Sequence, residues 1–263
     1  MKIHPSAVLE TGCELGINIE LGPYSVVHAG VQIGDGCQIG AHVVLLPYTR
    51  LGPDCRIHSG AVLGDLPQDL SFTPVVSRVE IGARCILREH VTVHRGTKEG
   101  TATVVGDDCY LMAHCHLAHN VLLGNRVILA NGALLGGYVE VGDRAFLSGN
   151  VTIHQFVHIG RLAMVGGLSG ISKDVPPFCT TEPLGLNRIA GLNTVGLKRA
   201  GFTPEQRLDI RRAFKRLYHS GLNTTQAVER LRKEFPSGPA SEFVAFIEKS
   251  TRGLCGLGRE TSE

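Results

Sequence analysis

Three histidines lie close together in the segment His114-Cys115-His116-Leu117-Ala118-His119-Asn120. A neutral imidazole ionises near physiological pH, so it can take a proton from a hydroxyl that attacks a thioester. A histidine on a protein surface can also be merely solvated. The segment therefore contains candidate general bases, and their role depends on the elements that position them.

A six-residue repeat dominates the sequence around these histidines. Every sixth residue from Ile3 to Ile171 is Ile, Leu or Val, with the two exceptions of Asp69 and Glu99. Glycine often follows this aliphatic residue, and a small residue often stands two positions before it. One large and one small residue two positions apart indicate a short strand with both side chains inward. Helical periodicity does not fit this pattern.

Most of the cysteines occupy the small inward position of this repeat. They behave as small hydrophobic residues, and no Cys-X-X-Cys pair suggests a structural zinc site or a disulfide framework. The six cysteines in this position are Cys13, Cys37, Cys55, Cys85, Cys109 and Cys115.

The repeat resembles that of the hexapeptide-repeat transferases. This resemblance implies a left-handed parallel β-helix of triangular cross-section, in which three hexads form one coil of 18 residues. Residues 3–176 would then form almost ten coils, each of which covers the core of its neighbours. We expect an all-β fold of this kind with a small C-terminal α-helical domain.

The interruptions of the repeat suggest the domain organisation. Residues 65–78 and 95–103 are polar and read as loops that leave a β-helix domain of residues 1–178. A connector of irregular structure is expected over 179–195, and a helical domain over 196–263. Thr203-Pro204 is a helix start with proline at the first position, and further helices are expected after Asn223, through Phe235, and after Ser241, through about Ser250.

Residues 18 apart should lie above one another in such a fold. His119 then stacks with Gly137 and Gln155, and Ala118 stacks with Gly136 and His154. The two glycines would leave an open slot between His119 below and His154 and Gln155 above, lined by groups that can titrate or form hydrogen bonds.

An ordered set of motifs makes the resemblance more specific. Gln68-Asp69-Leu70, Val93-His94-Arg95-Gly96-Thr97, His116-Leu117-Ala118-His119, Ile153-His154-Gln155-Phe156, Val165-Gly166-Gly167, Asp174-Val175-Pro176-Pro177, Gly196-Leu197-Lys198-Arg199 and Ser250-Thr251-Arg252-Gly253-Leu254 occur in this order. Together they resemble the acyl-ACP–UDP-N-acetylglucosamine O-acyltransferases, which catalyse the first step of lipid A synthesis. The resemblance covers nearly the whole chain.

This resemblance implies a role for several residues. His119 would be the catalytic base that deprotonates the sugar 3-hydroxyl. Gly167 would limit the length of the acyl chain. The implied substrate contacts are Gln68 and Asp69 from a neighbouring subunit's loop, His116, Gly137, Tyr138, His154 and Gln155, and Asn193 and Arg199 on the nucleotide side. A homotrimer with sites between subunits is implied, with acyl carrier protein as donor and no cofactor or metal.

Three positions depart from the family's usual pattern. Ser71 stands where a lysine is usual, Tyr138 where a histidine is frequent, and Ala200 where a second arginine is common. Alanine cannot replace an arginine fork. The departures are compatible with weaker binding, with a 3-amino sugar acceptor that gives an amide, or with a divergent paralogue without activity.

Charge and hydropathy bear on the partners. Lys and Arg number 26 against 24 Asp and Glu, so no global field favours nucleic acid. No apolar run could span a bilayer and no secretory signal is apparent, so we expect a cytoplasmic protein. Complementary charge would steer an acidic carrier protein to basic residues near the helical domain. These residues are Lys198, Arg199, Arg207, Arg211, Arg212, Lys215 and Arg216.

Other functions stay open at this level. The protein could be a hexapeptide acyltransferase with another acceptor or with coenzyme A as donor. It could be a metal hydratase or metal-binding protein that holds zinc through His119, His154 and His158. It could also be a scaffold without catalysis.

Overall fold

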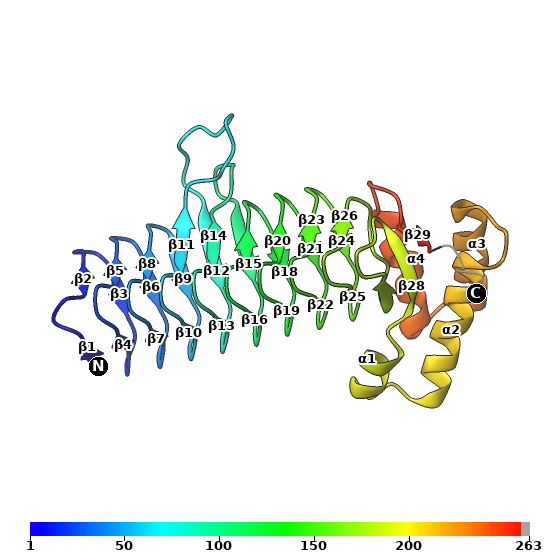
Figure 1. Cartoon of the computed structure of the whole chain (residues 1–263), viewed down its shortest axis with the longest axis horizontal. Coiled ribbons are helices and arrows are strands. Elements are labelled where there is room, and N and C mark those ends of the chain that lie inside the picture. Colours follow the sequence, from blue (N-terminus) through cyan, green and yellow to red (C-terminus); the bar gives the residue numbers. More distant parts are fainter. Residues whose placement is uncertain (259–263) are drawn as a thin grey trace.

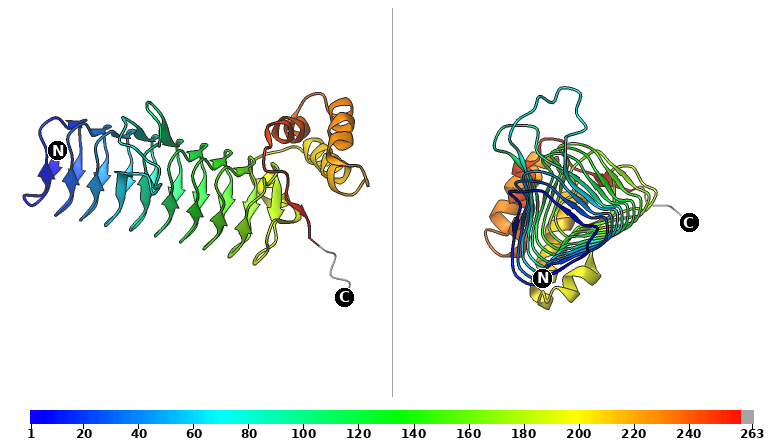
Figure 2. Two further views of the ribbon diagram at one scale, coloured as in Figure 1. Left: turned by 90° about the horizontal axis from the view of Figure 1, so that it is seen from above. Right: turned by 90° about the vertical axis from the view of Figure 1, so that its left-hand side faces the viewer.

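Short strands wind into a triangular prism, as predicted (Figures 1 and 2). The structure is a computed structural model that describes residues 1–258. Strands in successive coils pair in parallel, with aliphatic residues aligned, such as Leu111 with Leu129. The coils form a left-handed β-helix whose faces we name A, B and C.

The faces follow one another in every coil. Face A contains β1 (Lys2–Ile3), β4 (Glu20–Leu21), β7 (Gln38–Ile39), β10 (Arg56–Ile57), β13 (Ile86–Leu87), β16 (Tyr110–Leu111), β19 (Ile128–Leu129), β22 (Phe146–Leu147), β25 (Met164–Val165), β27 (Cys179–Thr181), β28 (Arg188–Leu192) and β29 (Gly256–Leu257). Face B contains β2 (Val8–Leu9), β5 (Val26–Val27), β8 (Val44–Leu45), β11 (Val62–Asp65), β14 (Thr92–His94), β17 (His116–Leu117), β20 (Leu134–Leu135), β23 (Thr152–Ile153) and β26 (Gly170–Ile171). Face C contains β3 (Glu14–Leu15), β6 (Gln32–Ile33), β9 (Thr49–Leu51), β12 (Arg78–Ile81), β15 (Ala102–Val105), β18 (Leu122–Leu123), β21 (Glu140–Val141) and β24 (His158–Ile159).

The core of the prism follows the hexad pattern. The aliphatic residues of the repeat are buried from Leu21 onward, except Val75 in the first loop, and the first coil is more exposed. Cys37, Cys55, Cys85 and Cys109 stack in consecutive coils, and each thiol donates to a glycine carbonyl at 3.0–3.2 Å. All eight cysteines are free thiols. The cysteines therefore fill the core in the way the repeat predicted, apart from Cys13, which is half-buried.

Two loops leave the prism at the corner between faces B and C, which we call the B–C corner (Figure 2). The first connects β11 to β12 and the second connects β14 to β15. Gly64 has φ +93°, and a Cβ on this residue would overlap the Thr49 hydroxyl. Only glycine therefore fits where the chain turns out of the prism into the first loop.

Four helices follow the prism. They are α1 (Thr194–Arg199), α2 (Pro204–Tyr218), α3 (Thr224–Glu234) and α4 (Glu242–Lys249), with a short 3-10 turn η1 (Pro239–Ser241) before α4. Thr203 and Asn223 cap α2 and α3 with reciprocal side-chain hydrogen bonds, which confirms both predicted helix starts. Helix α1 was not predicted, and residues 259–263 of the expected helical domain lie outside the described residues.

The expected irregular connector over 179–195 is wrong in part. Strands β27 and β28 form an antiparallel pair that extends face A, and β28 also pairs with β29 near the end of the chain. The hydrophobic pattern did not reveal these strands because the hexad register ends at Pro176-Pro177. Strands β27, β28 and β29 thus connect the segment that contains the helices to the last coils of the prism.

None of the described helices is long and apolar enough to cross a membrane.

Candidate active site

The B–C corner brings most of the predicted site residues together. His116 projects outward from β17, His119 follows it at the corner, and Asp69 lies in the first loop. Gly137, Tyr138, His154 and Gln155 occupy the same corner in the next two coils, as the hydrogen bonds Tyr138 N to His119 O and Phe156 N to Gly137 O require.

The predicted slot above His119 is not empty at Gly137. A Cβ at Gly137 would overlap the imidazole ring of His119 in the coil below. The ring thus fills the space that the glycine leaves, and it also packs edge-on against Tyr138 with ring centres 5.3 Å apart. A side chain at residue 137 would therefore displace the His119 ring from this position.

A directional hydrogen-bond network holds His119. Asn120 is 6% exposed, and its Oδ1 lies 3.0 Å from the Thr97 amide nitrogen. Since an amide N–H can only donate, the facing Asn120 atom must be the oxygen. The same oxygen lies 3.2 Å from His119 Nδ1, so Nδ1 must carry the proton. The other ring nitrogen, Nε2, then presents a lone pair.

The network continues to Tyr138. The Thr97 hydroxyl donates to Asn120 Oδ1 at 3.0 Å and lies 2.8 Å from the Tyr138 hydroxyl. Because the single Thr97 hydroxyl proton is already used, Tyr138 must be the donor to Thr97. Tyr138 thus connects to His119 through two intermediate groups, and its ring stacks on Phe156 at 5.0 Å.

A buried histidine, His94, and a half-buried one, His116, stand beside this network. His116 and His94 meet edge-on with ring centres 4.9 Å apart, and Thr92 Oγ1 lies 2.7 Å from His116 Nδ1. Burial, together with the charge of His94, lowers the pKa of His116 to about 4. Burial also lowers the pKa of His94, against the opposing charge of Asp65. Both rings are therefore neutral at physiological pH.

Asp69 is oriented by its own loop. The amide and hydroxyl of Ser71 donate to Asp69 Oδ1 at 2.9 and 2.7 Å. These bonds, with a smaller contribution from His119, hold the pKa of Asp69 below its usual range. Ser71 thus sets the direction of the Asp69 carboxylate, and the implied contact of Asp69 with the site of a neighbouring subunit stays a prediction. Gln68 is exposed in the same loop.

Three predicted site residues lie elsewhere in this chain. Gly167 occupies the corner between faces A and B, where a Cβ would meet only ordinary contacts at 3.6–3.7 Å. Asn193 and Arg199 line a cavity of about 650 Å³ against face A, together with Arg126, Arg144 and Met164. Face A is opposite the B–C corner in the triangular section, so one chain does not bring them to His119 (Figure 2).

Asn193 already has two structural partners. Its Oδ1 accepts from Gly196 N at 2.8 Å and caps α1, while its Nδ2 donates to Leu162 O at 2.9 Å. The α1 residue Arg199 is exposed and forms no ion pair within residues 1–258. Arg199 is thus the more available of the two for a ligand.

Sequence reasoning missed four residues of the corner as site residues. These residues are His94 at the end of β14, Arg95 and Thr97 in the second loop, and Asn120. The loops add residues between coils, so the 18-residue spacing does not relate the first three to His119. His114, by contrast, lies at the A–B corner, where it stacks on His90 with ring centres 5.1 Å apart. The position of Asn120 directly after His119 was the one signal available.

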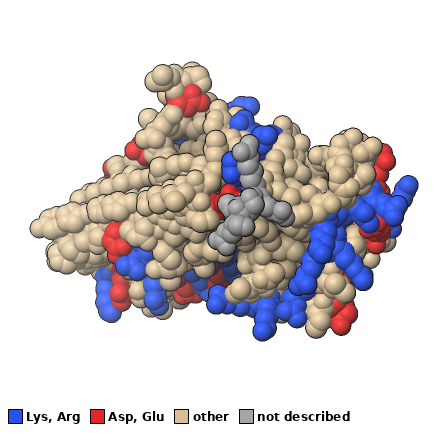
Figure 3. Space-filling model, turned by 45° about the vertical axis from the view of Figure 1, so that its right-hand side comes forward, with Lys and Arg blue, Asp and Glu red and all other residues tan. Residues whose placement is uncertain are grey.

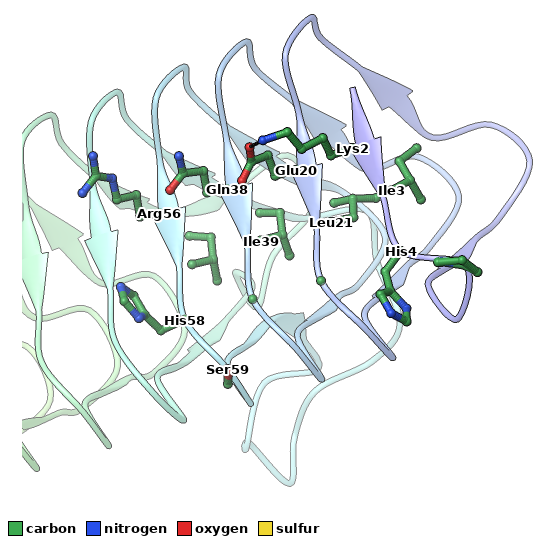
Figure 4. Close-up of a pocket in the computed structure, with 14 residues that line it drawn as sticks. Lys2, Ile3, His4, Glu20, Leu21, Gln38, Ile39, Arg56, His58 and Ser59 are labelled. Atoms are coloured by element: carbon green, nitrogen blue, oxygen red, sulfur yellow. Dashed lines mark hydrogen bonds and ion pairs between the residues drawn. The ribbon is translucent and has the colours of Figure 1, made fainter.

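Another groove lies far from this corner. It has a volume of about 660 Å³ and runs over the first coils of face A (Figure 4). Lys2 pairs there with Glu20 at 2.7 Å, and the row continues with Gln38 and Arg56. None of the predicted site residues lines it.

The alternative of a metal-binding protein has no support from a cluster of ligands in the described part of this chain. Within residues 1–258, no group of three or more His, Cys, Asp or Glu side chains is placed to hold a metal ion. His158 projects from face C and lies 3.9 Å from Glu140.

Comparisons with known proteins agree with the hexad fold and the C-terminal segment. The family model described as Udp N-acetylglucosamine O-acyltransferase, Domain 2, matches residues 174–255. The bacterial transferase hexapeptide model matches residues 12–47, 30–65 and 102–137.

Named relatives cover nearly the whole chain. An acyl-(acyl-carrier-protein)–UDP-N-acetylglucosamine O-acyltransferase of Halorhodospira halophila is 43% identical over 96% of this chain and 98% of its own. One of Anaeromyxobacter dehalogenans is 41% identical over 97% and 99%.

Solved structures agree with this assignment. The UDP-N-acetylglucosamine acyltransferase of Campylobacter jejuni matches with a TM-score of 0.90 and 36% identity, over 98% of this chain and 100% of its own. That of Francisella novicida matches with a TM-score of 0.93 and 34% identity, over 98% and 95%. The chain belongs to the family of acyl-(acyl-carrier-protein)–UDP-N-acetylglucosamine O-acyltransferases.

Proposed function

We propose that this acyltransferase moves a 3-hydroxyacyl chain from acyl carrier protein to the 3-hydroxyl of UDP-N-acetylglucosamine, with His119 as general base. The reaction is the first step of lipid A biosynthesis. The observation that carries the proposal is the network that protonates His119 Nδ1 and leaves Nε2 free. This network stands in a chain whose relatives bear the name of this activity.

The chemical step follows from that tautomer. Nε2 takes the proton of the sugar hydroxyl while its oxygen attacks the thioester carbonyl carbon. The carbon–sulfur bond then breaks, and the imidazolium returns the proton to the departing thiolate. Asn120 stabilises the imidazolium of His119 through a hydrogen bond to Nδ1. It carries no charge, so it adds no ionic attraction to this hydrogen bond.

We assign the acceptor sugar to the surroundings of His119. Asp69 and Gln68 approach from the loop, and His154 and Gln155 are exposed in the coil two above His119. His116 offers a neutral ring nitrogen, since its Nδ1 is already engaged by Thr92. Each of these groups can form hydrogen bonds with sugar hydroxyls.

A homotrimer would complete the site. A UDP-sugar that reaches His119 and Arg199 must contact the B–C corner and face A, which lie on opposite sides of one prism. When face B of each prism packs on face A of the next around a threefold axis, the A–B corners meet at the axis. The B–C corner of one subunit then adjoins the cavity of its neighbour.

The outward residues of the faces support this packing. The row on face B, from Val8 in β2 to Gly170 in β26, contains no Asp, Glu, Lys or Arg. On face A the row is polar in the first coils, as Figure 4 shows, and apolar from Ile86 to Met164. The uncharged row of face B and the later coils of face A suit an obligate interface.

We assign the nucleotide to the cavity on face A. Arg144 and Arg199 line it and have no ion pair in residues 1–258, whereas Arg126 lies 3.8 Å from Asp108. Guanidinium groups suit a diphosphate. Asn193 acts through α1, which it caps. Gly167, where the chain itself would tolerate a Cβ, leaves room for a long acyl chain at the A–B corner.

The carrier protein would dock at the helical end. Lys and Arg gather there in Figure 3, and Lys198, Arg211 and Lys215 are exposed with no ion pair among the described residues. Arg212 and Arg216 are paired with Asp209 and Glu234, so they contribute less. Acyl carrier protein and nucleotide sugars are cytoplasmic substrates, which supports a cytoplasmic enzyme.

The test is the mass of the product. The trimer is incubated with UDP-N-acetylglucosamine and a panel of 3-hydroxyacyl carrier proteins, and we expect one acylated sugar whose mass gives the chain length. His119→Ala should abolish the product without changing the trimer. Product formed only from the 3-amino sugar would instead establish N-acylation, and unchanged activity in His119→Ala would refute the assignment of the base.

A further inference from the structure

The tip of the first loop is weakly attached to the prism. Its final residues are held by the second loop, through Gly100 N to Val76 O at 2.8 Å and Ser77 Oγ to Gly96 O at 2.6 Å. The tip itself has hydrogen bonds only within the loop, and Leu70 is fully exposed. Contacts other than these hydrogen bonds must therefore set the position of the tip and of Asp69.

Arg95 provides a contact between the tip and the prism. Its guanidinium carbon lies 5.5 Å from the ring centre of Tyr48 on the prism and 6.0 Å from that of Phe72 in the loop. Nε is buried and has no hydrogen-bond partner. No carboxylate within residues 1–258 pairs with this side chain, so the two aromatic rings are the groups that its charge faces.

The backbone fixes both ends of this contact. The Arg95 amide donates to Asp65 O at 3.0 Å, where the two loops leave the prism side by side. Phe72 N donates to Asp69 O at 3.0 Å, and Ser71 donates twice to the Asp69 carboxylate. Phe72 and Asp69 therefore belong to one turn, and the position of the ring sets the position of the carboxylate.

We propose that Arg95 is a positioning residue that clamps the first loop through Phe72 and so sets the position of Asp69. The link to catalysis rests on the proposed function, in which Asp69 contacts the acceptor sugar. The clamp itself is a property of the fold and can be measured without any substrate.

Hydrogen–deuterium exchange of the loop amides, residues 66–75, tests the clamp in the full-length trimer. Phe72→Leu keeps apolar bulk but removes the aromatic face, and we expect about tenfold faster exchange in the tip. Phe72→Tyr is the matched control, since it keeps the face and should exchange like the parent. Arg95→Met should resemble Phe72→Leu, and Arg95→Lys should be intermediate. Exchange in β20 reports whether each variant is folded.

Kinetics then test the link to Asp69. With Phe72→Leu we expect the KM for the acceptor sugar to rise about tenfold while the KM for the acyl carrier protein stays unchanged. In an Asp69→Asn background the same substitution should have no further effect, because the clamp acts through that carboxylate. If Phe72→Leu merely damaged the structure, it would lower activity equally in the parent and in the Asp69→Asn variant.

The outcomes separate the two hypotheses. Equal exchange in Phe72→Leu and Phe72→Tyr would overturn the clamp. Faster exchange with an unchanged KM for the sugar would overturn the positioning role. Faster exchange in a protein that forms no acylated sugar would support the clamp and refute the proposed function.

Discussion

At the residue scale, Gly137 determines whether His119 can adopt its position. A methyl group there would overlap the imidazole and displace it from Asn120, while the backbone of residue 137 itself is unstrained. We expect Gly137→Ala to lower kcat by about 100-fold, with little change in thermal stability. Gly256→Ala is the control, because nothing lies within 4 Å of its added methyl. Full activity in Gly137→Ala would contradict the geometry.

Asn120 gives a second prediction at this scale. Asn120→Leu removes the oxygen that selects the His119 tautomer and leaves the Thr97 amide unpaired, so kcat should fall about 100-fold. Asn120→Asp keeps the oxygen and adds a negative charge, which stabilises the imidazolium.

The sign of the pH effect follows from that charge. A stabilised imidazolium loses its proton only at higher pH, so the neutral His119 that acts as the base forms only at higher pH. We expect the acid limb of the kcat/KM profile of Asn120→Asp to move upward by about one pH unit. A limb at the parent's pH would show that residue 120 does not contact the ionising group.

Residue-level prediction from the sequence succeeded where the 18-residue spacing holds. His119 and Gly137 are one coil apart with no insertion between them, so their stacking could be foreseen. The spacing could not say that the ring fills the gap, because a side-chain rotamer has no periodic signal. Thr97 and Arg95 reach the corner through loops of arbitrary length, and only the folded chain reveals them.

At the element scale, the stacked cysteines Cys37, Cys55, Cys85 and Cys109 form a column in the core. Substitutions in this column can show whether hydrogen bonding or side-chain volume matters more for stability. Cys85 is fully buried between Cys55 and Cys109, and its thiol donates to Gly106 O at 3.0 Å. Serine can donate to the same carbonyl, so Cys85→Ser should cost about 1 kcal/mol or less.

A larger side chain at the same position should cost more. Cys85→Leu overfills a column that repeats once per coil, and we expect about 1–3 kcal/mol of destabilisation in chemical denaturation. If the serine variant were the less stable of the two, volume would not govern this column.

Element prediction from the sequence was strongest where one register persists. The six-residue repeat was sufficient to predict the prism because every coil repeats the same inward positions. Strands β27 and β28 were missed because they follow two prolines and pair antiparallel, outside the repeat. Helix α1 has six residues, too few to express an amphipathic period.

At the scale of the whole molecule, the separation of His119 from Arg199 leads to a prediction about mixed trimers of the proposed homotrimer. His119→Ala and Arg199→Ala should each be nearly inactive. If both residues belonged to one chain's site, co-refolded mixtures would stay inactive. If a site takes His119 from one subunit and Arg199 from the next, a functional site needs an Arg199→Ala chain followed by a His119→Ala chain.

Random assembly of equal amounts fixes the expected yield. Each of the three positions has the required order with a probability of roughly one in four, so the mixture should recover roughly one quarter of the parental activity. The two variants mixed without unfolding are the control and should remain inactive. Recovery near one quarter would establish a site shared between subunits. Its absence after verified subunit exchange would mean that Arg199 and His119 do not act on one substrate.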